Sequence, residues 1–356
     1  MTGLRIADFG VRIGRMEPGK ENRITDVPGV RVGHATIRDG RQRTGVTVIL
    51  PCGDNPFTKK LVAACHVQNG FGKTCGLVQI EELGELETPI ALTSTLNVGL
   101  VADALVTLTA RRCEGERIPV RSVNPVVGET NDSRLNAVLD RPVGLHQVTE
   151  AIESACIHFE EGDVGAGAGT VCHGLKGGIG SASRIVTVAG VPYTTGVLVQ
   201  SNHGCLEELR VDGRPVGREI LRARREEAGG LGEREQTEDR GSVMVIMATD
   251  LPVDSRQLKR ILKRCAAGLA RCGSYFGHGS GDIFLGFTTA NRIPTGPMDA
   301  VRRIDVLSEH TLERAFLAAA EATEEAVLNS LAAASPAVAA DGTRYDSLAD
   351  WLRRLA

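Results

Sequence analysis

The stretch Asp239-Arg240-Gly241-Ser242-Val243-Met244-Val245-Ile246-Met247-Ala248-Thr249-Asp250 marks an abrupt change of character in the chain. A charged segment ends at Gly241, and a hydroxyl residue opens an apolar run that predicts a buried strand. Thirteen of the 23 residues over 218–240 are charged, which predicts a solvated linker, with an ordinary surface loop as the alternative. We therefore divide the chain into residues 1–241 and residues 242–356.

The residue that follows this junction has the chemistry of a nucleophile. A hydroxyl at a chain terminus can be activated by its own α-amine, whose pKa of about 7.7–8.0 suits a base at neutral pH. A preceding glycine allows the strained backbone that attack on its carbonyl requires. Our hypothesis is that the chain cleaves itself between Gly241 and Ser242, and that Ser242 then serves as the nucleophile of an amide hydrolase. A Gly-Ser dipeptide is also a common turn, so the hypothesis depends on the residues around it.

A second hydroxyl and carboxylate pair occurs in Ser280-Gly281-Asp282. Residues two apart on a strand point the same way, so Ser280 and Asp282 are expected to reach one site together. The alternative for Ser280 is a serine in a glycine-rich turn.

Length and composition indicate a globular protein with a sizeable core. The 356 residues are 42% apolar and 24% charged, and the net charge of −3 gives no basic footprint, so no nucleic-acid partner is expected. The first residues lack an apolar signal region, and no uncharged apolar run approaches the length of a membrane span. Nine cysteines, scattered singly, predict reduced thiols. We therefore expect a cytoplasmic protein without membrane contact.

No motif indicates a metal or a cofactor. Histidine and acidic residues do not fall at metal-ligand spacing, and we interpret Cys65-His66 and Cys172-His173 as buried cysteines beside packed histidines. The spacing Gly165-x-Gly167-x-Gly169 resembles a dinucleotide fingerprint, but no acidic residue follows a second strand at the required place. We interpret this segment as backbone that closely approaches a substrate or another strand.

The order of elements predicts α+β layering rather than strict βαβ alternation. Residues 1–23 are expected to form an irregular arm and residues 125–136 a loop. Upstream of the junction we expect strands over 27–34, 44–50, 120–123, 185–188 and 195–199, and helices over 59–66, 93–110 and 148–159. Downstream we expect strands over 242–248 and 280–289, and helices over 258–269, 312–331 and 345–355.

Long, collinear motifs over nearly the whole chain resemble the DmpA family of self-processing aminopeptidases, also called β-aminopeptidases or L-aminopeptidase/D-esterases. These motifs are ITDVPGVRVGH over 24–34, TGVTVILP over 44–51, NGFGK over 69–73, PVVGET over 125–130, KGGIGSASR over 176–184, VLVQSN over 197–202 and Gly241-Ser242. The resemblance implies one hydrolase domain over 1–356, built as a four-layer αββα sandwich similar to N-terminal-nucleophile hydrolases but differently connected. It also implies cleavage into a large chain (1–241) and a small chain (242–356) that stay together, and a tetramer of the processed pair.

The resemblance places the family's functional residues on particular positions of this chain. The nucleophile falls on Ser242, the assisting serine and carboxylate on Ser280 and Asp282, the oxyanion-stabilising asparagine on Asn202, and the glutamate that holds the substrate's amine on Glu129. Without the resemblance, Asn202 would be interpreted as a loop-capping residue and Glu129 as a solvated surface acid.

Two positions depart from the pattern of the family. Asn131 stands where the best-known members have a tyrosine that is thought to help stabilise the oxyanion, and an amide has a shorter reach. Asp282 stands where a glutamate is expected, one methylene longer. Both departures bear on substrate preference.

The expected function is that of a self-cleaving aminopeptidase acting on small peptides, amides or esters with a free amine. The Ser242 hydroxyl attacks the substrate carbonyl, its own α-amine takes the proton, and Asn202 with nearby backbone N–H groups stabilises the oxyanion. One alternative is an amidase of ω-amino-acid oligomers, or an acyltransferase, of the same fold, whose nucleophile is usually threonine. Another is a non-catalytic descendant that keeps the fold as a binding protein.

Overall fold

The computed structural model describes residues 3–227, 241–295 and 301–356. Strand β11 (Gly241–Thr249) forms where the apolar run after the junction predicts a strand. It lies between β10 (Val191–Asn202), to which it is antiparallel, and β12 (Ser280–Pro294), to which it is parallel. Ser242 is paired with Asn202 on one side and with Gly281 on the other. Segments far apart in the sequence therefore meet at the start of β11.

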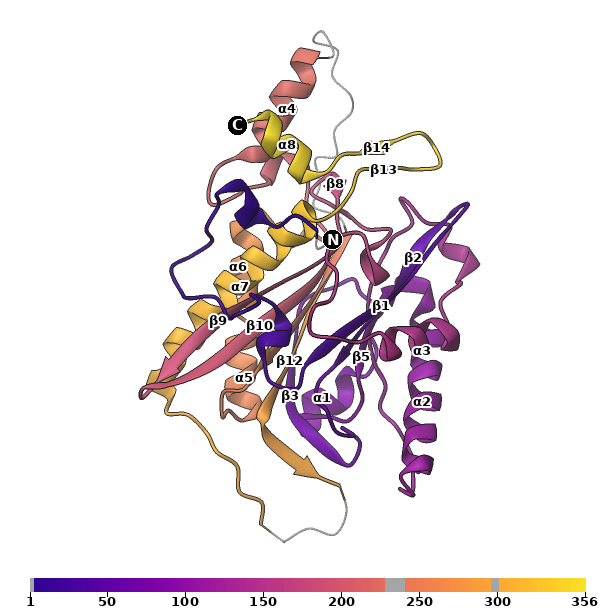
Figure 1. Ribbon diagram of the computed structural model, residues 1–356, viewed down its shortest axis with the longest axis vertical. Helices are drawn as coiled ribbons and strands as arrows, with labels where there is room; N and C mark the ends of the chain where they lie inside the picture. The colour runs from indigo at the N-terminus through magenta and orange to yellow at the C-terminus, as the bar shows by residue number, and fades with distance from the viewer. Residues whose placement is uncertain (1–2, 228–240, 296–300) are drawn as a thin grey trace.

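Two stacked sheets form the centre of the molecule (Figure 1). The four-stranded sheet has the order β1-β2-β5-β6 and the six-stranded sheet the order β4-β3-β12-β11-β10-β9. The remaining strands of these sheets are β1 (Arg31–Asp39), β2 (Gln42–Leu50), β3 (Lys59–Gly70), β4 (Glu85–Leu86), β5 (Ile90–Ser94), β6 (Val126–Thr130) and β9 (Ile179–Val188). Two small hairpins join β7 (Val171–Cys172) to β8 (Leu175–Lys176), and β13 (Ala337–Val338) to β14 (Arg344–Tyr345).

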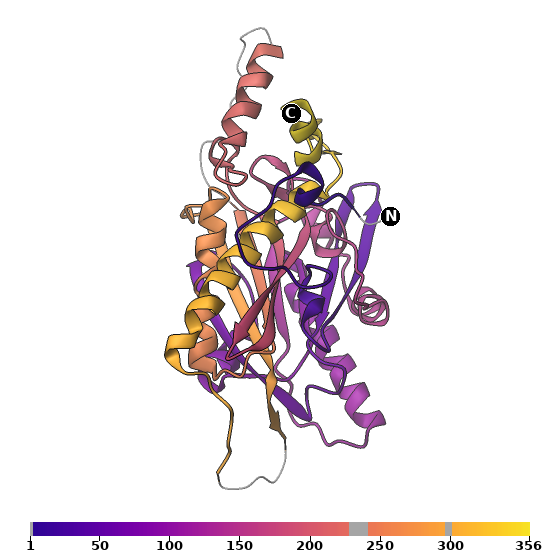
Figure 2. The same cartoon turned by 60° about the vertical axis from the view of Figure 1, so that its left-hand side comes forward.

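Helices cover the outer face of each sheet, as Figures 1 and 2 show. The four-stranded sheet is covered by α2 (Val98–Gly115) and α3 (Leu145–Glu153), and the six-stranded sheet by α5 (Ser255–Leu262), α6 (Cys265–Arg271) and α7 (Leu312–Ala332). The shorter helices are α1 (Leu77–Leu83), α4 (Val216–Glu227) and α8 (Leu348–Arg354). The expected four-layer αββα sandwich is confirmed.

Strand alternation divides the side chains of β11 between two cores. Met244 and Ile246 lie in the core between the sheets, whereas Val243 and Val245 pack against the helices of the outer layer. Because side chains alternate along a strand, the Ser242 hydroxyl lies on the face of Met244 and is directed between the sheets.

Several predicted elements were wrong. Residues 59–66 belong to strand β3 and not to a helix, because a short apolar run buried on both faces cannot be told from a helix by periodicity alone. The strand expected over 120–123 is instead β6, within the segment expected to be a loop. The helix expected over 93–110 begins only at Val98, because residues 90–94 form β5, and the helix expected over 258–269 is divided into α5 and α6.

The predicted linker over 218–240 also requires a correction. Residues 218–227 belong to helix α4, whose buried residues Val216, Ile220 and Leu221 join the core beneath α7. The charges outnumber the apolar residues here, but Val216, Ile220 and Leu221 recur at helical spacing and form a narrow apolar stripe. Arg224 of α4 pairs with Asp346 and lies over the Trp351 ring, so α4 and α8 pack side by side at one end of the molecule. The rest of the predicted linker, 228–240, lies outside the described residues.

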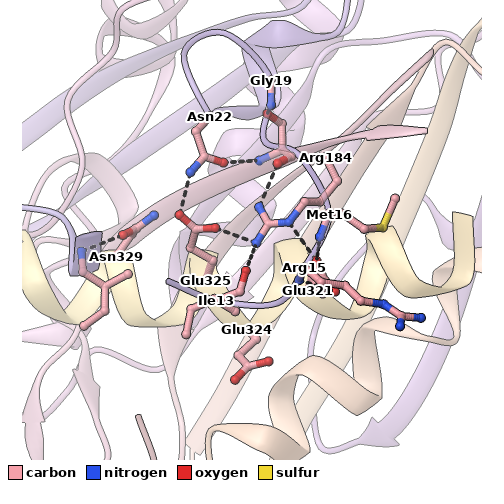
Figure 3. A network of polar contacts seen from close by, with 12 residues as sticks. Ile13, Arg15, Met16, Gly19, Asn22, Arg184, Glu321, Glu324, Glu325 and Asn329 are labelled. Carbon is pink, nitrogen blue, oxygen red and sulfur yellow. Dashed lines mark hydrogen bonds and ion pairs between the residues drawn. The ribbon is translucent and has the colours of Figure 1, made fainter. Parts of the chain in front are cut away.

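The N-terminal arm is fastened to the sandwich by a buried arginine of β9 (Figure 3). Arg184 is 1% exposed, and its guanidinium contacts Glu321 at 3.2 Å and Glu325 at 2.7 Å, both on α7. The same guanidinium donates a hydrogen bond of 2.8 Å to the carbonyl of Ile13 in the arm. Asn22, further along the arm, donates to the Glu325 carboxylate at 2.5 Å. One cation thus joins β9, α7 and the arm.

We expect Arg184→Met to lower the free energy of unfolding by about 3–5 kcal/mol, because two buried carboxylates lose their compensating charge. The measurement is urea unfolding at neutral pH. The control is Arg41→Met, which removes an ion pair to Asp140 whose arginine side chain is 77% exposed, and which is expected to change stability by less than about 1 kcal/mol. Equal losses in the two variants would contradict this interpretation of the network.

Candidate active site

Ser242 is buried at the point where the two sheets meet. It is 3% exposed, and its Oγ accepts a hydrogen bond of 3.3 Å from the backbone N–H of Asn131, the residue that follows β6. The hydroxyl thus belongs to the six-stranded sheet, and the group that donates to it belongs to the edge of the four-stranded sheet.

The residue before Ser242 has room only for a glycine. Gly241 has a φ of 145°, and a Cβ there would lie 1.9 Å from the carbonyl oxygen of Asn202 and 3.1 Å from the Cα of His203. Any side chain would therefore push the start of β11 away from the end of β10. This close approach fixes where the Gly241–Ser242 peptide lies.

Asn202 ends β10 directly opposite Ser242. Its Oδ1 accepts a hydrogen bond of 3.0 Å from the backbone N–H of Val171, and its Nδ2 donates one of 3.0 Å to the carbonyl of Asn131. The first bond sets the orientation of the amide, so that the donor end faces the same residue that contacts Ser242. Asn202 is therefore a held amide donor beside the hydroxyl and not a cap on a solvated loop.

A buried lysine organises the glycine-rich segment behind Asn202. The Nζ of Lys176 donates to the carbonyls of Gly167 (2.9 Å), Thr170 (3.0 Å) and Gly177 (2.7 Å). Burial lowers the pKa of Lys176 to about 7, and the negative charge of Asp163 opposes this shift. A Cβ on Gly167 would lie 2.6 Å from the backbone nitrogen of Ile179 in β9, and one on Gly169 would lie 2.2 Å from the carbonyl oxygen of Arg43 in β2. The prediction that these glycines allow close backbone approach to another strand is confirmed.

Ser280 and Asp282 form a buried pair beside the backbone of Ser242. The Ser280 Oγ donates to the Asp282 Oδ1 at 2.7 Å, so the prediction that they point the same way is confirmed. Phe284, on the same face of β12, packs in the core beneath the outer helices. The pair therefore lies on the helix-facing side of the sheet, opposite to the face that carries the Ser242 hydroxyl.

Glu129 is buried in β6, so its alternative interpretation as a solvated acid is wrong. It is 3% exposed, and its Oε1 accepts a hydrogen bond of 2.8 Å from the backbone N–H of Lys73. Burial raises the pKa of the Glu129 carboxyl, and the Lys73 hydrogen bond offsets only part of that effect. Such a carboxylate has much to gain from a cationic partner.

Asn131 contributes to the site through its backbone. Its side chain is exposed, and its Oδ1 accepts a hydrogen bond of 3.0 Å from the N–H of Ser133, as in an Asx turn. The amide that was expected to replace a tyrosine is thus engaged in the turn, whereas the backbone N–H contacts Ser242. Sequence reasoning missed this donor, because every residue except proline carries one.

Asp132 holds this turn in place and was also missed. Its Oδ1 accepts hydrogen bonds from the Ser94 hydroxyl at 2.8 Å and from the Asn136 amide at 3.0 Å. Burial raises the pKa of the Asp132 carboxyl. The run Asn131-Asp132-Ser133 is typical of a turn, and that was the only signal in the sequence.

Comparison with known proteins finds relatives of this chain among peptidases. Peptidase family S58 matches residues 22–345. The chain belongs to peptidase family S58. The β-peptidyl aminopeptidase BapA of Sphingosinicella microcystinivorans is 39% identical to it, over 96% of this chain and 88% of that protein.

Two solved structures extend the match to the whole S58 fold. A β-aminopeptidase from Burkholderia sp. superposes with a TM-score of 0.89 at 39% identity and covers 99% of each chain. The L-aminopeptidase D-Ala-esterase/amidase from Ochrobactrum anthropi, described as a prototype of the serine aminopeptidases and a variant of the Ntn hydrolase fold, has a TM-score of 0.87 at 33% identity, over 99% of this chain and 98% of that one. The resemblance to the DmpA family and the expected enzyme class, a serine aminopeptidase, are confirmed.

Within the described ranges of this S58 chain, none of the helices combines the length and the apolarity needed to cross a membrane.

Proposed function

We propose that this S58 peptidase is a self-cleaving aminopeptidase that removes the N-terminal residue from small peptides, amides or esters, with Ser242 as its nucleophile. The observation that carries the proposal is the buried Ser242 hydroxyl, which follows a position that only glycine can occupy and lies beside the donors of Asn202 and Asn131. The aminopeptidase names of the relatives support the reaction class.

Self-cleavage begins with attack of the Ser242 Oγ on the carbonyl carbon of Gly241. The peptide C–N bond breaks as the C–O bond forms, and the hydroxyl proton is transferred to the departing nitrogen, which becomes the α-amine of Ser242. Water then hydrolyses the ester, releasing the Gly241 carboxylate and restoring the hydroxyl. The tight packing of Gly241 against Asn202 supports this step, because it holds the carbonyl and the hydroxyl in a fixed relation.

In the processed enzyme the α-amine of Ser242 is the general base. Ser280 and Asp282 lie on the face of the sheet opposite to the Ser242 hydroxyl, so they are placed to approach the backbone nitrogen rather than the side chain. The Ser280 hydroxyl donates its hydrogen bond to the Asp282 carboxylate. The lone pairs of the Ser280 oxygen are then left to accept a hydrogen bond from the Ser242 ammonium. This pair would orient the amine and move its proton to the leaving group.

The oxyanion of the tetrahedral intermediate has two candidate donors, the Nδ2 of Asn202 and the backbone N–H of Asn131. Both are fixed before the reaction by contacts among Asn202, Asn131 and Val171, so little reorganisation is needed. Hydrogen-bond donors that are fixed in advance where negative charge develops usually make the largest single contribution to lowering the barrier of such a reaction.

Glu129 is the proposed anchor for the free amine of the substrate. A buried carboxylate with a raised pKa gains strongly from an ammonium, and this pairing would restrict the enzyme to unblocked N-termini. The buried, hydrogen-bonded set around Ser242 argues against a non-catalytic descendant, and a serine nucleophile argues against an ω-amino-acid oligomer amidase or acyltransferase. We further propose that the enzyme acts in the cytoplasm as a homo-oligomer.

We expect freshly purified protein to give two bands on a denaturing gel. Divided in proportion to residue number at Gly241, the 37.8 kDa chain yields pieces of roughly 26 and 12 kDa. Ser242→Ala should leave one band and release no p-nitroaniline from aminoacyl anilides, because the attacking oxygen is missing. Ser133→Ala, which removes an exposed hydroxyl nearby, should split normally. A Ser242→Ala variant that splits at the same bond would exclude Ser242 as the attacking group.

We expect Asn202→Ala to lower the kcat of processed enzyme about 100- to 1,000-fold, since it removes an oxyanion donor. Asn131→Ala keeps the backbone N–H that contacts Ser242, so its kcat should fall less than about tenfold, which corresponds to 1.4 kcal/mol. Steady-state kinetics on the separated, fully processed fraction distinguish the two. A larger loss for Asn131→Ala would show that its side chain, and not its backbone, is the donor.

We expect kcat/KM for aminoacyl anilides to fall as pH drops through the pKa of Glu129, because only the ionised carboxylate attracts the substrate ammonium. Burial raises that pKa above its ordinary value of 4.5, so activity is present above the raised pKa and lost below it. Glu129→Gln should raise KM and remove this acidic limb, whereas Glu114→Gln on the exposed face of α2 should retain it. An unchanged limb in Glu129→Gln would assign it to another group.

A further inference from the structure

Three side chains with metal-binding atoms meet immediately behind Asn202. Cys172, His173 and His203 are each 0% exposed, and one candidate ligand atom from each lies within 4.8 Å of the others. The Cys172 Sγ is 3.8 Å from the His203 Nδ1, and the two imidazole rings are in edge contact with centroids 5.2 Å apart. Cys172-His173 alone was interpreted as a buried cysteine beside a packed histidine, because His203 is 30 residues away in the chain and reaches the pair only through the path of β10.

The distance between the Cys172 Sγ and the His203 Nδ1 suits two ligands of one tetrahedral ion. With Zn–S near 2.3 Å and Zn–N near 2.0–2.1 Å, two ligand atoms on one zinc ion lie about 3.3–3.6 Å apart. The observed separation of Cys172 and His203 is within a few tenths of an ångström of that value. The His173 Nδ1 contacts the carbonyl oxygen of Cys205 at 3.0 Å, which makes Nδ1 the protonated nitrogen and gives Nε2 the lone pair. A carbonyl acceptor of this kind is the usual support of a histidine that binds a metal.

The cluster also lies on both backbone segments that hold Asn202. Cys172 follows Val171, whose N–H fixes the Asn202 amide, and His203 follows Asn202 itself. A Cβ on Gly241 would lie 1.9 Å from the carbonyl oxygen of Asn202 and 3.1 Å from the His203 Cα, so both residues border the start of β11. An ion held by Cys172 and His203 would therefore tie β7 to the end of β10 beside Ser242.

We propose that Cys172, His173 and His203 form a binding site for one borderline-soft divalent cation, with Zn²⁺ the best match to a thiolate and two imidazoles. Binding forms one metal–sulfur and two metal–nitrogen bonds and releases the Cys172 thiol proton to solvent. Three protein ligands leave the fourth tetrahedral position to water. The competing interpretation is a Cys172 thiol that donates a hydrogen bond to His203 and binds no metal.

The test is a Co²⁺ titration of metal-free, full-length protein, followed by absorption spectroscopy. We expect one Co²⁺ per chain, with a thiolate-to-cobalt charge-transfer band in the near ultraviolet, visible bands of tetrahedral Co²⁺, and displacement by Zn²⁺. Cys172→Ser should lose the charge-transfer band, and His203→Gln should weaken binding at least about tenfold. Cys156→Ser, which removes the exposed thiol, should leave the spectrum unchanged.

Two outcomes would overturn the proposal. One is a wild-type protein that gives no thiolate-to-cobalt band at saturating Co²⁺. This outcome does not depend on the folding of any variant. The other is a band that persists in Cys172→Ser or disappears in Cys156→Ser, which would place the metal on another thiol. The circular dichroism of each variant checks its fold. Since no readout depends on cleavage or turnover, failure of the metal site would leave the proposed function untouched.

Discussion

The arrangement of the site depends on how closely the end of β10 approaches the start of β11. The carbonyl of Asn202 lies where a side chain of residue 241 would have to be, so the backbone there is fixed from one side by β10 and from the other by β12. Strand pairing sets the position of Ser242, and alternation sets the direction of its hydroxyl. The backbone N–H of Asn131 then donates to the hydroxyl, and the amide of Asn202 donates to the carbonyl of the same Asn131. The site is thus a product of strand register, which explains why the end of β10, the start of β11 and the residue after β6 meet within hydrogen-bond distance.

Much of the fold could be predicted from the sequence where one physical signal dominated. The apolar run after Ser242, the hairpin of β1 and β2, and the long alanine-rich helix α7 all carry unambiguous periodicity. The failures occurred where two structures share one pattern. Strand β3 is apolar on both faces, so the short run over 59–66 fitted a helix equally well, and the charges of α4 concealed its narrow apolar stripe. Strand β6, which carries Glu129, is only five residues long and stands between Pro125 and the turn residues Asn131-Asp132-Ser133, so the segment was interpreted as a loop.

In the candidate site, too, some residues could be predicted from the sequence and others could not. Ser242, Ser280, Asp282, Asn202 and Glu129 came from their chemistry together with the family resemblance, and the structure places each in a buried, hydrogen-bonded position. The donor of Asn131 was missed because it is a backbone N–H, and backbone donors leave no trace in residue identity. Asp132 and Lys176 were missed because the partners of their side chains, Ser94 and Asn136 for one and three backbone carbonyls for the other, meet them only in the folded chain. The proximity of His203 to Cys172 is likewise a result of tertiary pairing. Residue types identify possible chemistry, whereas long-range pairing decides which groups act together.

The network around Arg184 has a consequence for the order of events in the life of the protein. Arg184 and the arm belong to the segment before the junction, whereas Glu321 and Glu325 belong to the segment after it, and both β10–β11 and β12–β3 pairings join the two segments. The backbone geometry at Gly241 exists only once these pairings have formed. A break in the chain at that point would therefore follow folding and could not precede it, and the two pieces would already be interlocked by a shared sheet and a buried cation. Cleavage of this kind would act as a checkpoint, because only a correctly assembled chain could become an active enzyme.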